Sequence, residues 1–364
     1  MPSCEILNSK YDVQKSTDIY SEMLLPMSQG SLGEAMENLT QITVFCSQYG
    51  REQWYWYCYV LILLYMFALP VGILGNITAL INYTCCKKSW TTSKIFLFNL
   101  VLCDFAWIST LPITIYFNLQ RPTLTDAQIF CQFKKIFFNI NIYGSIFFLT
   151  LISFDRYVGT VHPISSLNWW NKEKAKICSI SVWTILFLGS IPDFFYTFAV
   201  KRQDNVTVCI DHIQGPFTYV KTISILRTII GFLVPFSVML AFYIMTAKAL
   251  RNLPKRMSNG RKSGKPFMLI SAAILIFIVS FVPYHVMIMT LIFLRIDKKI
   301  NKNNVNILYA AYQFFEAVFS ISSCLDPILY ILASEQFQKR WLALKKHPKT
   351  ICFCSRRQRV GVIR

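Results

Sequence analysis

The sequence is poor in charged residues, and acidic residues are the scarcest of them. Only 15% of its 364 residues are Asp, Glu, Lys or Arg, whereas soluble globular domains carry about 25%. Apolar residue types make up 54% of the chain. This composition excludes a disordered protein and favours one that is solvated largely by lipid.

The sequence also lacks the motifs of common enzyme classes. Neither a G-x-S-x-G nucleophile elbow nor a P-loop occurs. The four histidines are scattered, at positions 162, 212, 285 and 347, so their spacing predicts no metal cluster. We therefore expect no enzyme. A membrane transporter is the weaker alternative from another class, because no internal repeat is visible.

Long apolar runs dominate what is present. A membrane-spanning helix needs about 20 mostly apolar residues, and the sequence predicts an all-α membrane protein with a bundle of seven such helices. The predicted spans are Trp54–Tyr83, Ser93–Leu119, Gln128–Val161, Lys174–Phe198, Tyr219–Leu250, Pro266–Leu294 and Val305–Leu332.

Basic residues cluster between the predicted spans in an alternating pattern. The net charge is +19, and 23 of the 37 Lys and Arg residues fall in four stretches. These stretches are 85–94, 156–176, 248–265 and 339–364. The positive-inside rule assigns all four to the cytoplasm, which explains the charge without a nucleic-acid partner and predicts an extracellular N-terminus and a cytoplasmic C-terminus.

This topology predicts three regions. Residues 1–53 form an extracellular tail, residues 54–333 the seven-helix domain, and residues 334–364 a short amphipathic helix and a cytoplasmic tail. Glycosylation sequons begin at Asn38 and Asn205 in the extracellular parts. Cys352 and Cys354 follow the amphipathic helix and are candidates for palmitoylation, although free thiols explain them equally well.

Several ionisable residues fall inside the predicted spans, where burial in lipid is costly and a function is the first hypothesis. They are Asp104 in span two, Asp155-Arg156-Tyr157 at the inner end of span three, His285 in span six, and Glu316 and Asp326 in span seven. Single charges of this kind can also serve as contacts between helices. The presence of ionisable residues in several of the spans favours a function in which these residues act together.

In order along the chain, these motifs resemble those of the rhodopsin-like (class A) G-protein-coupled receptors. The resemblance covers roughly residues 55–345. The motifs that carry it are Gly75-Asn76, Leu100-Val-Leu-Cys-Asp104, Asp155-Arg156-Tyr157, Trp183, Pro235 with Tyr243, Phe277 with Pro283, and Asp326-Pro327-x-x-Tyr330.

The resemblance implies that the protein is a plasma-membrane receptor whose partners are the lipid bilayer, an extracellular small-molecule ligand and a heterotrimeric G protein. Arg156 would be held by Asp155 in the resting state and would turn toward Tyr243 and Tyr330 on activation. Phe281, where the family usually has Trp, and Pro283 would form a packing switch in span six.

The resemblance further implies two local sites. Asp104, Ser145, Ser323 and Asp326 would form a polar pocket for an allosteric sodium ion, and we expect no other cofactor. Cys131 and Cys209 match the family's disulfide between span three and the second outer loop.

The closer resemblance is to the purinergic nucleotide receptors and their carboxylate-sensing relatives, such as the succinate receptor. Stretches that carry it include Asn141-Ile-Tyr143-Gly-Ser145 and Phe281-Val-Pro283-Tyr284-His285. The resemblance implies a nucleotide or small organic anion as ligand. The candidate ligand-binding residues are Lys135, Tyr143, Arg227, His285 and Glu316.

At two positions where the resemblance leads us to expect a basic residue, this chain has a different residue type. Span six has Ile288 and span seven has Glu316. A carboxylate at Glu316 would repel an anionic ligand unless it pairs with Lys135 or Arg227. The alternative is therefore a receptor of the same fold for a non-anionic or cationic ligand.

Overall fold

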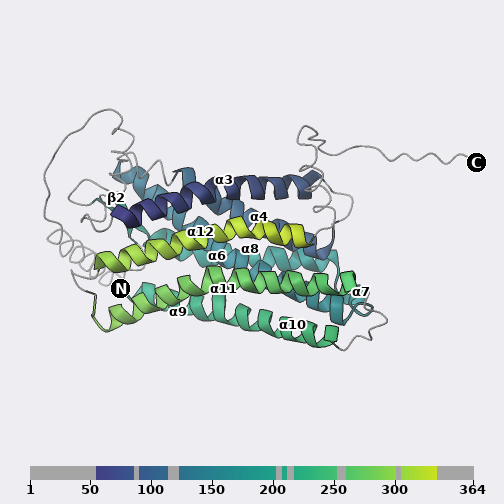
Figure 1. Ribbon diagram of the computed structural model, residues 1–364. Helices are drawn as coiled ribbons and strands as arrows, with labels where there is room; N and C mark the ends of the chain where they lie inside the picture. The colour runs from purple at the N-terminus through teal and green to yellow at the C-terminus, as the bar shows by residue number, and fades with distance from the viewer. Residues whose placement is uncertain are drawn as a thin grey trace, which may run out of the picture.

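A computed structural model describes residues 55–85, 90–113, 123–201, 207–210, 217–251, 260–300 and 305–333. Its long helices form one elongated bundle (Figure 1). In chain order the elements are α3 (Tyr55–Cys85), α4 (Thr92–Ile108), α6 (Leu124–Val161), α7 (Ser166–Trp169), α8 (Lys172–Tyr196), α9 (Phe217–Leu226), η5 (Arg227–Leu233), α10 (Val234–Arg251), α11 (Gly260–Ile296) and α12 (Val305–Ala333). A hairpin of two strands, β1 (Phe198–Lys201) and β2 (Thr207–Ile210), follows α8.

The helices match the predicted spans. Helices α9, η5 and α10 are consecutive and together form the fifth span, in which η5 is a π-helical turn. Six spans in the described residues are long and apolar enough to cross a membrane, and α12, with 29 residues, packs against α3, α4 and α11 as the seventh. The prediction of a seven-transmembrane bundle is confirmed.

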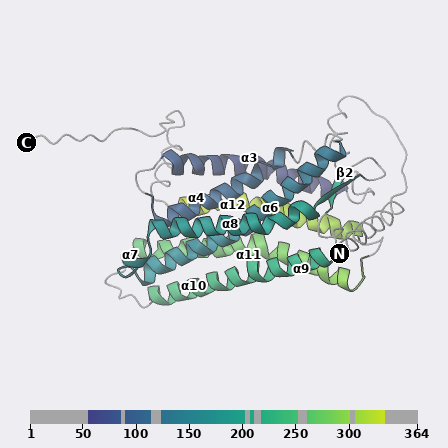
Figure 2. The ribbon, with the colours of Figure 1, turned by 180° about the vertical axis from the view of Figure 1, so that it is seen from behind.

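The hairpin and α7 lie at opposite ends of the bundle, as the front and rear views both show (Figures 1 and 2). Helix α7 follows Asp155-Arg156-Tyr157. We therefore call the end of the bundle near α7 the inner end, and the end near the hairpin the outer end. The predicted N-terminal tail, the amphipathic helix after α12, Asn38, Asn205, Cys352 and Cys354 all lie outside the described residues.

Polar residues at the helix starts explain where the helices begin. Thr91, Thr123 and Asn171 precede α4, α6 and α8, and each side-chain oxygen accepts a hydrogen bond from the backbone N–H three residues later. These caps satisfy donors that the first helical turn leaves free. At Thr123 the hydroxyl also donates to Asp126 Oδ2, at 2.6 Å.

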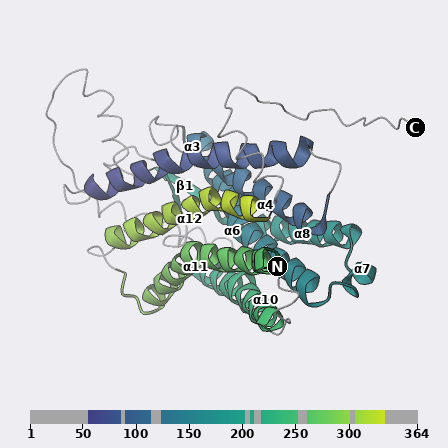
Figure 3. The ribbon, with the colours of Figure 1, turned by 45° about the vertical axis from the view of Figure 1, so that its right-hand side comes forward.

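Helix α6 is the central element of the bundle. It contacts α4, α8, α10, α11 and the hairpin, whereas α8 exposes large apolar side chains such as Ile180 and Leu188 on its outer side. This arrangement follows from lipid solvation, because apolar side chains can face the bilayer while polar ones must find partners inside the bundle. In Figure 3, α3 runs along the upper edge of the bundle, with α12 and then α11 below it.

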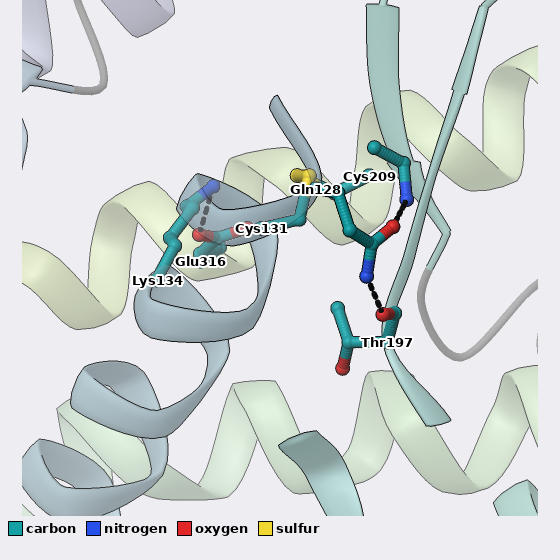
Figure 4. Close-up of a disulfide and its surroundings, with 7 residues drawn as sticks. Gln128, Cys131, Lys134, Thr197, Cys209 and Glu316 are labelled. Atoms are coloured by element: carbon teal, nitrogen blue, oxygen red, sulfur yellow. Dashed lines mark hydrogen bonds and ion pairs between the residues drawn. A yellow bond between two sulfur atoms is a disulfide. The ribbon is translucent and has the colours of Figure 1, made fainter. Parts of the chain in front are cut away.

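The hairpin was not expected from the sequence, which predicted only helices. Its strands are antiparallel, with Ala199 opposite Cys209. The predicted disulfide between Cys131 and Cys209 is confirmed and joins β2 to α6, with the two Cα atoms 5.5 Å apart. Gln128, one turn before Cys131, attaches the start of the hairpin (Figure 4). Its Oε1 accepts from Ala199 N at 2.7 Å, and its Nε2 donates to Thr197 O at 2.8 Å.

Gly144 marks a close approach of α6 to α4. A Cβ added at Gly144 would lie 2.5 Å from Cys103 Sγ, which is fully buried. Gly159, in the same helix, is exposed and would place an added Cβ in open space. The two glycines therefore form a matched pair, one at a helix contact and one outside it.

We expect Gly144→Ala to destabilise the protein by about 1–3 kcal/mol, because the new methyl group overpacks the contact with α4. Gly159→Ala should be neutral or stabilising, since Ala is favoured over Gly in a helix by roughly 0.5–1 kcal/mol. Thermal unfolding of the purified protein measures both effects. Adding Cys103→Ala should restore part of the loss at Gly144, and equal midpoints for the two single variants would contradict this account.

Candidate functional site

A cavity lies between α6, the α9–η5 segment and α11, in the outer half of the bundle. The space left inside it is only about 10 Å³, room for roughly one water molecule. The residues that line it are polar and aromatic for the most part: Asn139, Tyr143, Ser224, Arg227, Thr228, Tyr284, His285 and Ile288. The structure thus brings together Tyr143, Arg227 and His285 from the predicted ligand-binding set.

Arg227 is held by a buried ion pair with Asp193 of α8. The guanidinium donates to both carboxylate oxygens, with Nη1 3.1 Å from Oδ1, and Nη2 also donates to Gly189 O at 2.8 Å. The side chains of Arg227 and Asp193 are only 13% and 3% exposed. The pair connects the fourth and fifth spans at the wall of the cavity.

Asp193 also accepts hydrogen bonds from side chains of neighbouring helices. Asn139 Nδ2 donates to Oδ2 at 2.6 Å, and the Tyr219 hydroxyl donates to Oδ1 at 3.0 Å. With the two Arg227 bonds, this carboxylate accepts four hydrogen bonds, which compensates its loss of water. The Arg227 guanidinium also lies 5.7 Å from the centre of the Tyr143 ring.

Glu316 pairs with neither of the two residues proposed for it. Its Oε1 lies 2.9 Å from Lys134 Nζ, so the ion pair joins α12 to α6 below the disulfide (Figure 4). Lys135, the next residue, instead lies over the Phe138 ring at 5.9 Å. Because successive residues in a helix point about 100° apart, only one of the two lysines can face α12.

His285 faces the cavity with one ring nitrogen already bonded. Its Nδ1 lies 2.9 Å from Phe281 O, and its ring stacks on Phe232 at a centroid distance of 4.2 Å. Its Nε2 is buried without a hydrogen-bond partner, and so is the hydroxyl of Thr228. Deeper in the bundle, Phe281 packs between Phe277 and Phe319, in the same helix as Pro283.

A second polar cluster lies between α4, α6 and α12, deeper than the cavity. Asn141 Nδ2 donates to Asp104 Oδ1 at 3.1 Å and contacts Ser323 Oγ at 3.3 Å. The carboxyl groups of Asp326 and Asp104 lie next to each other, and both residues are buried. Ser145 Oγ and Asp326 Oδ1 have no hydrogen-bond partner.

This cluster can hold one small cation. Two adjacent carboxylates cannot both stay charged in a low-dielectric interior without a shared proton or a cation between them. The unpartnered oxygens of Ser145 and Asp326 are hard ligands of the kind that alkali and alkaline-earth cations prefer. The predicted residues therefore fit a sodium ion, and the structure adds Asn141 as the bridge between them.

At the inner end, the expected ion pair between Asp155 and Arg156 is not formed in the described part of the chain. Asp155 instead accepts hydrogen bonds from the Ser93 hydroxyl and from Trp170 Nε1, the latter at 2.8 Å. It thereby connects α6 to the start of α4 and to the segment between α7 and α8. Arg156 is half-buried, and its Nε makes no hydrogen bond.

The other predicted activation residues lie at the same end. The Tyr157 ring stacks on Phe242 of α10 at 5.2 Å, next to Tyr243 in the sequence. Pro327 lies in α12 against α3, where a Cβ added at Gly75 would meet it at 2.7 Å. Tyr330 belongs to α12, but its side chain lies outside the described part of the structure.

Sequence reasoning missed three members of these sites. Asp193 follows Pro192 inside span four, and the rule that ionisable residues in spans deserve attention would have found it. The resemblance points to Lys135 and not to its neighbour Lys134. Only the direction of the two side chains on the helix distinguishes them. Asn141 carries no charge, so its burial between Asp104 and Ser323 left no signal in the sequence.

Comparison with known proteins agrees with this architecture. The "7 transmembrane receptor (rhodopsin family)" pattern matches residues 75–330. P2Y purinoceptor 1 of Gallus gallus is 32% identical over 284 residues, covering 76% of this chain and 77% of that receptor. The Homo sapiens P2Y purinoceptor 1 is also 32% identical, over 76% of this chain and 74% of the receptor.

A carboxylate receptor is a relative at a similar level. Succinate receptor 1 of Mus musculus is 31% identical over 269 residues, which cover 74% of this chain and 84% of that receptor. The family match spans more than half of the sequence, and the bundle carries the family's motifs in order. The chain therefore belongs to the rhodopsin family of seven-transmembrane receptors.

Proposed function

We propose that the protein is a multi-pass plasma-membrane receptor that transmits the binding of a small extracellular ligand to heterotrimeric G proteins. The observation that carries the proposal is the placement of two sites on α6. The cavity contacts its outer half at Asn139 and Tyr143, while Arg156 lies at its inner end with an unbonded Nε. The relatives' names, purinoceptor and succinate receptor, refer to small ligands.

In this proposal Asp155 holds the inner end closed. Its bonds to Ser93 and Trp170 connect three helical segments around Arg156. A change of helix packing at the cavity would loosen these contacts, and Arg156 would then be free to turn toward Tyr243 and Tyr330 and receive part of the G protein. Membership of the receptor family leaves the transporter alternative without support.

Asp155→Asn should raise basal G-protein activation. The uncharged amide weakens the bonds to Ser93 and Trp170, and loss of a hydrogen bond to a charged group costs about 1.5 kcal/mol, roughly a tenfold shift between two states. G-protein activation in transfected cells, measured without added ligand, tests this expectation.

Surface display of an N-terminal epitope tag on intact cells serves as the expression control and also tests the predicted orientation. Arg156→Ala in the Asp155→Asn background should remove the added signal. Basal activity that stays at the wild-type level in Asp155→Asn at equal surface display would count against the proposal. A tag detected only after permeabilisation would overturn the orientation.

We also propose that Asp104, Ser145, Ser323 and Asp326 hold a sodium ion that favours the resting packing. When bound, the ion would neutralise the adjacent carboxylates of Asp104 and Asp326. Asn141 would orient Asp104 and Ser323 toward it, as its hydrogen bonds to both side chains support.

The purified receptor should unfold at a higher temperature in NaCl than in choline chloride at equal ionic strength. At ten times its Kd, a bound ion adds about 1.4 kcal/mol to the free energy of unfolding. Asp104→Asn should abolish the difference between the two salts. The sodium site would be disproved by equal midpoints in the wild type or by a difference that persists in Asp104→Asn.

A further inference from the structure

Two buried polar atoms in the cavity wall have no hydrogen-bond partner within the described part of the chain. They are Nε2 of His285, on α11, and Oγ1 of Thr228, on η5. The two residues are only 2% and 8% exposed, so solvent outside the bundle does not reach these atoms. Because burying a polar atom without a hydrogen bond is strongly unfavourable, we expect a partner inside the cavity.

The hydrogen bond between His285 and Phe281 determines what this partner must do. The Phe281 carbonyl can only accept, so Nδ1 of His285 carries the proton in the 2.9 Å contact between them. In the neutral ring Nε2 is then an acceptor and requires a donor. The Thr228 hydroxyl can both donate and accept. The partner must therefore donate to His285, and it can form a second hydrogen bond with Thr228.

Arg227 adds further donors to the wall of the same cavity. Of its five N–H groups, Nη1 gives one to Asp193, and Nη2 gives one each to Asp193 and Gly189. Neither of these two residues takes the Nε–H or the second Nη1–H. A metal cation beside Arg227 would be repelled by its charge, and a halide ion has no proton to donate to His285. A neutral molecule that both donates and accepts matches all of these groups.

The size of the cavity limits this molecule to a single water. The space inside is about 10 Å³, which is close to the smallest volume that holds one water. Contacts on both sides fix the walls. A Cβ added at Gly231 of η5 would lie 2.8 Å from the Tyr143 ring, and Phe232 stacks on His285 at a centroid distance of 4.2 Å. Because η5 already contacts α6 and α11, Thr228 cannot approach His285 any further.

We propose that the cavity binds one ordered water, which donates to His285 Nε2, hydrogen-bonds with the Thr228 hydroxyl and accepts from Arg227. Three hydrogen bonds are the usual number for a buried water. The water joins α11 to η5, and hence the sixth span to the fifth. In this packing, residues that the resemblance assigns to ligand binding surround a structural water. The proposal goes beyond the receptor function above and depends on neither the ligand nor the G protein.

The first test is an electron-density map of the receptor, crystallised from a lipid phase, that resolves other buried waters. One peak should lie within hydrogen-bonding distance of both His285 Nε2 and Thr228 Oγ1, at about 2.6–3.2 Å. The peak should disappear in the double variant His285→Phe/Thr228→Val. It should remain in Thr290→Val, because Thr290 is on the exposed side of α11 and its hydroxyl donates to Val286 O at 2.8 Å.

The absence of a peak from the wild-type map would overturn the proposal, as would a peak that contacts only one of the two atoms or persists in the double variant. Crystals grown in bromide distinguish water from a halide ion. We expect no anomalous signal at this position, and a bromide peak there would also overturn the proposal. If a variant does not fold, the wild-type map and the bromide crystals decide the question.

The second test measures whether His285 and Thr228 share one partner. Thr228→Val and His285→Phe should each lower the thermal unfolding midpoint in nanodiscs, because each leaves the water with one bond fewer. Since both residues bind the same water, the double variant should lose less than the sum of the two single losses. His285→Gln places an amide near the position of Nε2 and should retain most of the wild-type midpoint.

The matched control combines His285→Phe with Thr290→Val, and here the losses should add, because the Thr290 hydroxyl bonds within its own helix. Additive losses for His285→Phe and Thr228→Val would overturn the shared water. Non-additive losses of equal size in the control pair would overturn it as well, because the coupling would then not be specific to the cavity.

Discussion

The need to neutralise carboxylates inside a lipid-solvated bundle determines much of this structure. Asp104, Asp155, Asp193, Glu316 and Asp326 are all buried in the described part of the chain. They are shielded from water inside the bundle, so most of their hydrogen-bond donors come from other helices. Each carboxylate consequently becomes a point where two or three helices are joined, and α6 contributes to these contacts at several depths through Lys134, Asn139, Asn141 and Asp155 itself.

The sequence predicted the parts of the fold that depend on local patterns. Apolar runs of sufficient length define the seven helices, because crossing the bilayer imposes a minimum length on each. The pairing of Cys131 with Cys209, which the family resemblance implied, is present in the structure. The resemblance also implied a polar cluster around Asp104 and a common site for Tyr143 and His285. The structure places these residues together in that way.

Pairings between distant residues could not be predicted in the same way. Glu316 contacts Lys134 and not Lys135, a choice set by the rotation of α6 relative to α12. Arg227 forms an ion pair with Asp193. The resemblance to the family concerns basic positions and does not reveal this acidic partner. Asp155 binds Ser93 and Trp170, although its neighbour Arg156 is the stronger electrostatic candidate. In each case the deciding factor is side-chain direction within the packed bundle, which sequence spacing alone leaves open.

The double attachment of the outer hairpin has a consequence for its behaviour under reducing conditions. The sulfur bridge fixes β2 to α6, while the amide of Gln128 independently holds Thr197 and Ala199 at the start of β1. These two bonds do not involve sulfur and lie one helical turn away. Reduction would therefore release β2 from α6 but leave β1 anchored through Gln128, so the hairpin would stay attached to the bundle by one strand.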